Sequence, residues 1–117
     1  MWKIDYYETT AGECPARDFL EELDKKTELP YAIRKLDLLE EFGHELRRPH
    51  AAPLADGIYE LRIPVQRKQF RLLYFFFFQD SIIISHGLKK EGKVPQAEIE
   101  KAKHHRTDYF SRHTRKK

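Results

Sequence analysis

The sequence contains a single cysteine, Cys14, so the chain cannot form an internal disulfide, and we expect it to fold in a reducing compartment. It also lacks a run of roughly 18 apolar residues and an apolar leader at its start, so we expect neither a membrane-spanning helix nor a secretory signal. The cytoplasm is the expected location. The 117 residues are enough for one domain with its own core, spanning residues 1–117.

Several catalytic motifs are missing as well. No cysteine cluster and no His-x-x-x-His spacing indicates a metal site, so no metal or other cofactor is expected. His104 and His105 are adjacent, and on a helix they would point about 100° apart, which is unsuitable for chelating one ion. The Gly-x-Ser-x-Gly turn of hydrolases and the glycine-rich phosphate loop are also absent. These absences do not exclude an enzyme that works without a metal ion.

Three runs of aromatic and β-branched residues occupy the stretch from Gly57 to Lys90, separated by turn-forming residues at 64–69 and 79–80. They predict three successive antiparallel strands. The second run, from Phe70 to Phe78, is apolar on both faces and is therefore expected to be the central strand, covered on one side and partly covered on the other. Arg71 begins this run. Because a buried guanidinium is costly, we expect Arg71 at a sheet end or in an open groove.

The rest of the chain supplies the cover for this sheet. Residues 2–7 are predicted to form a first strand, and apolar residues at helical spacing predict helices that begin near Pro15, near Glu28 and at Pro95. Residues 44–56, with two prolines, are predicted to be a surface connection. The fold class is therefore α+β, with the order β-α-α-β-β-β-α, a mainly antiparallel sheet and two N-terminal helices packed on it. Residues 113–117 are expected to be a frayed basic tail.

The formal net charge of +3 conceals an uneven distribution. Residues 1–56 contain 8 Lys and Arg against 13 Asp and Glu, whereas residues 57–117 contain 14 against 6. A domain with one basic side suggests a polyanionic partner, most simply nucleic acid. Cations that only keep the surface soluble are an equally good explanation of the charge alone.

Metal-free cleavage of RNA needs a base, cations beside the phosphate and an acid for the leaving oxygen. Arg62 and Arg71 come from neighbouring predicted strands and can converge on one phosphate. His86 titrates in a useful range, and Tyr109 is a candidate acid or stacking platform. Two structural alternatives stay open: His86 shares strand parity with apolar neighbours and can be a hydrogen-bonded core residue, and Tyr109 can complete the buried face of its helix.

Four further cations are candidates for binding the RNA backbone. They lie in the turn after the first run of the sheet and at the end of the third run: Arg67, Lys68, Lys89 and Lys90. Lysines at strand ends are also common as protection of sheet edges, which is the structural alternative.

Two stretches carry a resemblance to a known family: Pro-Leu-Ala-Asp-Gly-Ile-Tyr-Glu-Leu-Arg-Ile at 53–63 and His-Gly-Leu-Lys-Lys at 86–90. With the order of predicted elements, they make the chain resemble the RelE/ParE toxin superfamily, and within it the phage-derived HigB-like branch of type II toxin–antitoxin systems. The resemblance implies a RelE-like fold, a ribosome-dependent mRNA endonuclease, and an antitoxin partner, often a helix-turn-helix repressor. It implies that positions matching Arg62, Arg71 and the Lys89-Lys90 pair hold and activate the message.

One feature of such nucleases has no counterpart here. The position of a glutamate that some of them use as base matches Ala52, so the resemblance leaves the base unassigned. Two other functions stay open, namely a toxin on the same fold that poisons DNA gyrase and a non-catalytic module that binds an antitoxin or nucleic acid. The nuclease interpretation requires the cations to meet over a hollow in the sheet, and ion pairs with the chain's own carboxylates would count against it.

Overall fold

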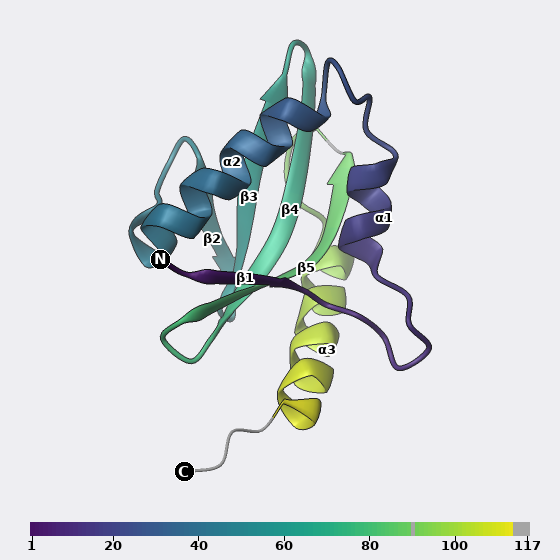
Figure 1. The fold of residues 1–117 in the computed structure, drawn as a ribbon, viewed down its shortest axis with the longest axis vertical. Coiled ribbons are helices and arrows are strands. Elements are labelled where there is room, and N and C mark those ends of the chain that lie inside the picture. Colours follow the sequence, from purple (N-terminus) through teal and green to yellow (C-terminus); the bar gives the residue numbers. More distant parts are fainter. Residues whose placement is uncertain (90, 114–117) are drawn as a thin grey trace.

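Five strands form one sheet in the computed structural model, which describes residues 1–89 and 91–113 (Figure 1). The elements in chain order are β1 (Lys3–Tyr6), α1 (Pro15–Glu21), α2 (Leu29–Phe42), the short 3-10 helix η1 (Gly43–Glu45), β2 (Ala51–Ala55), β3 (Ile58–Val65), β4 (Lys68–Phe77), β5 (Ser81–Lys89) and α3 (Gln96–Arg112). No helix within the described ranges is long and apolar enough to cross a membrane. Most of the predicted tail, residues 114–117, lies outside the described residues.

The strands are arranged in the order β1-β5-β4-β3-β2, and only β1 runs parallel to its neighbour. The α+β class and the mainly antiparallel sheet are therefore confirmed, as is the central place of β4. The predicted order of elements is wrong in one respect, because residues 44–56 are more than a connection. Within them β2 pairs with β3, Ala52 lying opposite Glu60. As an edge strand, β2 tolerates Pro53, which has no N–H to donate.

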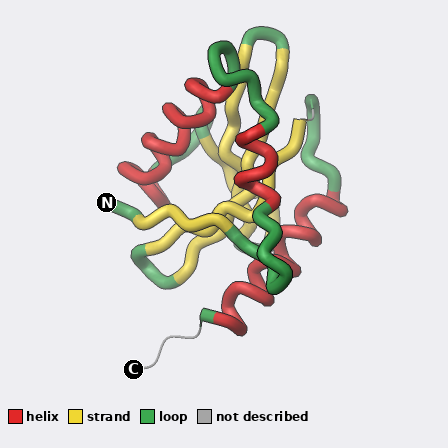
Figure 2. Tube along the Cα trace, turned by 45° about the vertical axis from the view of Figure 1, so that its right-hand side comes forward, coloured by secondary structure: helices red, strands yellow, loops and turns green. Residues whose placement is uncertain are grey.

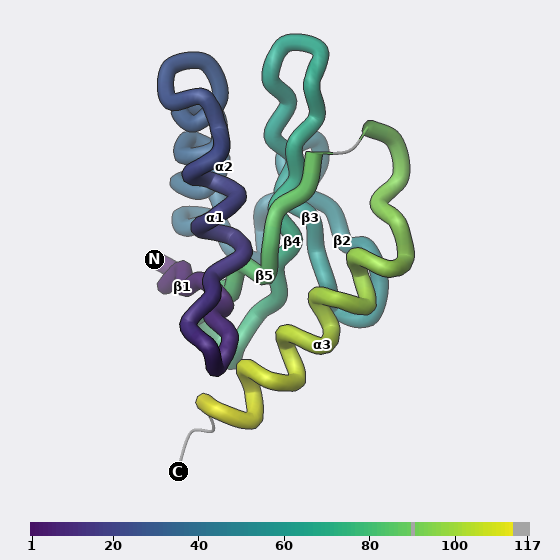
Figure 3. The backbone as a smooth tube through the Cα atoms, turned by 90° about the vertical axis from the view of Figure 1, so that its right-hand side faces the viewer, coloured from purple at the N-terminus to yellow at the C-terminus, as the bar shows by residue number. Residues whose placement is uncertain are grey.

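Helices cover both faces of the sheet, α1 and α2 on one side and α3 on the other (Figure 2, Figure 3). Side chains of β4 alternate between the two cores because successive residues of a strand point to opposite faces. Phe70, Leu72 and Tyr74 pack with α1 and α2, whereas Leu73, Phe75 and Phe77 pack with α3. Burial of such side chains contributes about 1.5–3 kcal/mol each, so β4 anchors both layers.

Two glycines allow close approaches between elements. A Cβ at Gly87 in β5 would lie 2.4 Å from the Phe19 ring of α1, so the absence of a side chain lets α1 pack directly on this strand. Gly43 ends α2 with a φ of 51°, a conformation that favours glycine, and the Trp2 indole occupies the space where its Cβ would be. The C-terminal end of α2 thus also holds the N-terminal segment, since the Trp2 N–H donates to the Glu40 carbonyl.

Candidate functional site

The face of the sheet toward α3 carries a group of charged side chains on β3 and β4. Arg62 and Arg71 are directly opposite each other in the antiparallel register, as the sequence predicted for cations from neighbouring strands. Glu60 lies two residues before Arg62 and therefore points to the same face. The three side chains form one cluster, and we refer to Glu60, Arg62 and Arg71 as the charged cluster.

Glu60 holds the two arginines together. Its Oε1 accepts a hydrogen bond from Arg71 Nε at 2.6 Å, and its Oε2 accepts from Arg62 Nη2 at 3.0 Å. Arg71 Nη2 also donates to the carbonyl oxygen of Gly92, in the segment between β5 and α3. The side chains of Glu60 and Arg71 are 5% and 9% exposed, whereas that of Arg62 is 26% exposed. Arg62 is therefore the member that solvent or a ligand reaches.

The prediction that Arg71 lies at a sheet end or in an open groove is wrong. Arg71 is the fourth residue of β4 and is almost fully buried, because the neighbouring strand supplies a carboxylate that compensates its charge. The cluster nevertheless has an excess of one positive charge, since two guanidinium groups share one carboxylate. The prediction did not include Glu60 as a member. Its strand parity with Arg62, two residues away, was the available signal.

His86 lies near the charged cluster, but its hydrogen bonds are with Ser85 and Glu98. The β4–β5 register shifts so that His86 pairs with Leu73 and Ile84 with Tyr74, leaving Ser85 as an extra residue in a β-bulge. The bulge places His86 on the α3 face and Ile84 on the other, so the predicted parity of His86 with its apolar neighbours is wrong for Ile84. Because Leu73 is the register partner of both His86 and Glu60, it separates the histidine from the charged cluster.

A chain of hydrogen bonds joins His86 to α3. Its Nε2 donates to Glu98 Oε1 at 2.9 Å, and its Nδ1 lies 2.7 Å from Ser85 Oγ, which lies 2.8 Å from Nδ1 of His105. With both imidazoles neutral, every group has a partner if Nδ1 of His105 donates to Ser85 and Ser85 donates to His86. Burial lowers the pKa of His86, and Lys101 lowers it further, while Glu98 opposes the shift. His86 is thus a buried residue that holds α3 on the sheet.

Tyr109 is not brought together with the arginines. It is buried in the second half of α3, where its ring packs edge-on against Phe77 near the end of β4 and its hydroxyl donates to Asp5 at 3.0 Å. Arg71 is near the beginning of the same strand, about 20 Å away at the rise of roughly 3.3 Å per strand residue. Tyr109 therefore serves as part of the buried face of its helix.

The predicted backbone-binding lysines lie partly together at the far end of the sheet. Lys68 and Lys89 line a pocket of about 240 Å³ with Phe70, and Lys68 makes an ion pair with the buried Glu28 at 2.7 Å. Arg67 is exposed in the turn between β3 and β4. Lys90 lies outside the described residues. The structure thus brings two of these four cations into one depression and places a third on the adjoining turn.

The charged cluster contains the groups that acid–base and phosphate chemistry use. Among the described residues, no three His, Cys, Asp or Glu side chains are grouped so that they could hold a metal ion. In the charged cluster a carboxylate lies between two guanidinium groups. A carboxylate can accept a proton, and guanidinium groups can stabilise charge on a phosphate.

Comparison with known proteins assigns the chain to a family. The family model described as phage-derived protein Gp49-like matches residues 18–107, which include α2, the whole β2–β5 sheet and most of α3. No curated protein matches the chain significantly. Since the family model covers more than half of the sequence, this chain belongs to the Gp49-like phage-derived proteins, a family within the RelE/ParE-like toxins of toxin–antitoxin systems.

Proposed function

We propose that this protein is the toxin of a type II toxin–antitoxin system and that it inhibits translation by cutting mRNA on the ribosome. Membership of the Gp49-like family supports the toxin and its antitoxin partner. The charged cluster is the observation that carries the cleavage proposal, because it combines a proton acceptor with two permanent cations on one face of the sheet. The antitoxin, which the resemblance suggests is a helix-turn-helix protein, would act by covering this region.

The exposure of the cluster suggests how a substrate enters it. Arg62 is the accessible member, so an RNA phosphate competes with Glu60 for its guanidinium. Oε2 of Glu60, released from Arg62, then accepts the proton of the ribose 2′-hydroxyl. The 2′-oxygen attacks phosphorus, the bond to the 5′-oxygen breaks, and the leaving oxygen takes a proton from water. Arg71 keeps its bond to Oε1 and holds the carboxylate in place.

The proposed roles differ from those expected from the sequence. Arg62 binds the phosphate directly, and Arg71 acts as a positioning residue for Glu60. His86 and Tyr109 have no part in proton transfer, because one holds α3 through Glu98 and the other is bonded to Asp5. Lys68, Lys89 and Arg67 would contact flanking phosphates at the far end of the sheet.

The same cluster also favours a second function, that of a non-catalytic module that binds an antitoxin. Both arginines are bonded to the chain's own Glu60, and Arg71 is buried, which is typical of a structural ion pair. This alternative predicts a protein that binds its antitoxin and does not arrest growth.

Inducible expression in a bacterium tests the proposal. We expect wild-type protein to arrest growth and cut mRNA. Glu60→Gln should reduce cleavage at least about 100-fold, as loss of a general base does, and Arg62→Ala should reduce it as well because the phosphate loses its guanidinium contact. Arg34→Ala is the matched control, because Arg34 is exposed on α2 over the other face of the sheet. Growth curves and primer extension on mRNA are the measurements, and circular dichroism checks that each variant folds.

Three results contradict the nuclease proposal and identify its replacement. If the Glu60→Gln variant still cleaves mRNA as the wild type does, the charged cluster takes no part in the reaction. Growth arrest with intact mRNA and DNA-damage signalling indicates a gyrase poison. Absence of arrest together with stable antitoxin binding indicates the non-catalytic module.

A further inference from the structure

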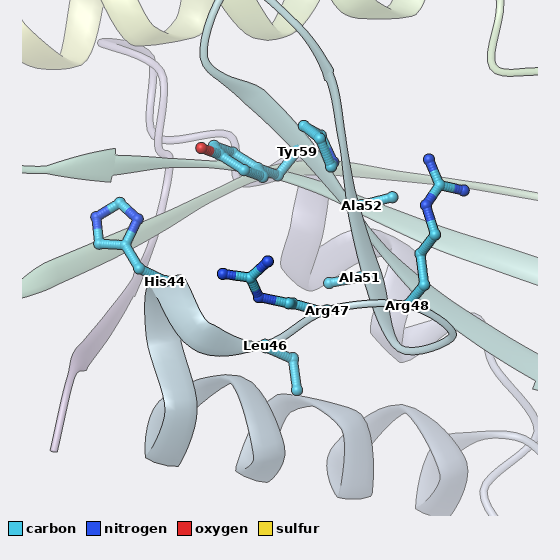
Figure 4. A pocket seen from close by; sticks show the side chains of 8 residues that line it. His44, Leu46, Arg47, Arg48, Ala51, Ala52 and Tyr59 are labelled. Carbon is cyan, nitrogen blue, oxygen red and sulfur yellow. The ribbon is translucent and has the colours of Figure 1, made fainter.

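A second basic depression lies on the face of the sheet that carries α2, on the opposite side from the charged cluster (Figure 4). It has a volume of about 430 Å³ and opens between η1, the connection that follows it, and the edge strand β2. Its lining consists of His44, Leu46, Arg47, Arg48, Ala51, Ala52, Pro53 and Tyr59. We refer to it as the η1–β2 pocket.

The cations of this pocket are not compensated. Arg47 and Arg48 are exposed, and neither side chain has a hydrogen bond or ion pair with another residue in the described part of the chain. No carboxylate is among the lining residues. The backbone at Arg47 is nevertheless fixed, because its carbonyl accepts hydrogen bonds from the N–H groups of His50 and Ala51. Unlike Arg62 and Arg71, these arginines have no bond to a carboxylate of the described chain that an external anion would have to displace.

Aromatic rings form the other part of the pocket, and neighbouring rings hold them in place. Tyr59 stacks on Tyr74 with ring centroids 5.5 Å apart, and His44 stacks on Phe76 at 3.5 Å. The Tyr59 hydroxyl has no hydrogen-bond partner among the described residues. In Figure 4 the Arg47 side chain extends toward His44, below the Tyr59 ring, while the Arg48 side chain extends upward on the far side of Ala52.

Fixed aromatic rings beside unpaired arginines are the combination that binds single-stranded nucleic acid. Every base has a flat face that can pack on an aromatic ring, and arginine grips phosphate oxygens in pairs. A pocket of about 430 Å³ is within the range that holds small ligands. An inorganic anion would use the arginines alone and leave the rings without a role.

We propose that the η1–β2 pocket binds one nucleotide of single-stranded RNA, with its base against Tyr59 and His44, its phosphate on Arg47 and the next phosphate on Arg48. The choice of RNA as the ligand rests on the proposed function, whereas the η1–β2 pocket is a separate site from the charged cluster. The edge strand β2 lies between the pocket and the cluster. Ala52 in the pocket lining pairs with Glu60, and the Arg62 N–H donates to the His50 carbonyl at 2.8 Å. An RNA strand that crosses β2 can therefore contact both faces.

Direct binding to the purified protein tests this inference. The probes are a six-residue oligoadenylate RNA, 5′-AMP, inorganic phosphate and a hexaglutamate peptide, each titrated by calorimetry at several salt concentrations. We expect RNA and 5′-AMP to bind more tightly than phosphate or the peptide. Arg47→Ala should weaken RNA binding by about tenfold and reduce its salt dependence by about one ion, since one phosphate contact is lost.

Two further variants separate charge from stacking. Arg47→Lys should restore part of the affinity because it keeps the charge, and Tyr59→Leu should weaken RNA and 5′-AMP by about tenfold while leaving phosphate unchanged. Thermal unfolding checks Tyr59→Leu, because Tyr59 packs on Tyr74. Arg34→Ala is the control and should bind as wild type does.

Each outcome decides the question. Equal RNA binding by wild type and Arg47→Ala overturns the proposal, as does phosphate binding as tight as that of 5′-AMP, which indicates a simple anion site. Tighter binding of the peptide indicates a surface for an acidic protein and also overturns it. Glu60→Gln should keep 5′-AMP binding even if it abolishes cleavage in cells, so failure of one proposal is distinguishable from failure of the other.

Discussion

Lowering the pH from 7.5 to 5 should destabilise the fold through His105. The imidazole of this residue stacks on the Tyr7 ring with centroids 4.1 Å apart, and its Nδ1 lies against Ser85 Oγ. Burial, followed by the neighbouring His86 and Lys101, lowers the pKa of His105 from 6.5 to about 4, although Asp108 opposes the shift. The folded protein therefore keeps His105 neutral at a pH where the unfolded chain protonates it.

The sign and the size of the effect follow from this difference. The contribution of neutral His105 to the free energy of unfolding is fully present above pH 6.5. It is lost as the pH falls toward 4, because the unfolded state binds a proton that the folded state does not. One unit of pKa corresponds to about 1.4 kcal/mol, so the loss from His105 alone is about 2 kcal/mol at pH 5. His86, whose pKa is also lowered, adds to this loss. Carboxylates with lowered pKa values, such as Asp108, lose their contribution only at more acidic pH.

Urea unfolding at pH 7.5 and pH 5 measures this loss by linear extrapolation. His105→Gln replaces the imidazole by an amide, which can hydrogen-bond to Ser85 and does not titrate, so it should reduce the difference in unfolding free energy between the two pH values by about 2 kcal/mol. His104→Gln is the matched control, because His104 is the exposed neighbour on the same helix. A His105→Gln variant with the full pH dependence of the wild type would refute the reasoning.

Two further predictions concern packing. Glu60→Leu leaves the buried Arg71 without its carboxylate and should cost about 3–5 kcal/mol in urea unfolding, whereas Glu60→Leu with Arg71→Met removes the unpaired charge and should recover most of the loss. A double variant no more stable than Glu60→Leu would contradict the buried ion pair. Gly87→Ala should lower the unfolding free energy by about 1–3 kcal/mol, because the new Cβ meets the Phe19 ring. An unchanged melting temperature would show that α1 can move away from β5.

The sequence predicted the fold best where a long run of residues followed one pattern. The run from Phe70 to Phe78 is apolar at both parities, which identified the central strand. In contrast, β2 consists of three alanines and Leu54 around Pro53, and none of these residues is β-branched or aromatic. It forms because β3 offers free backbone groups beside it, so only the tertiary arrangement specifies it.

The site was harder to predict, for two physical reasons. A single extra residue, Ser85, reverses the parity of β5, and alternation in the sequence does not show where a bulge occurs. Residue type alone also does not show whether an arginine is free. Glu60 and Arg62 are neighbours on one strand, but the bond from Arg71 depends on the register between β3 and β4.

The pairing of β1 with β5 has a consequence for synthesis of the protein. Lys3 lies beside Ser81, so the first strand to leave the ribosome has no partner until nearly all of the sheet has been made. α3 follows later still, and Tyr109 then reaches back to Asp5. A nascent copy therefore stays open at both ends until β5 and α3 have been made.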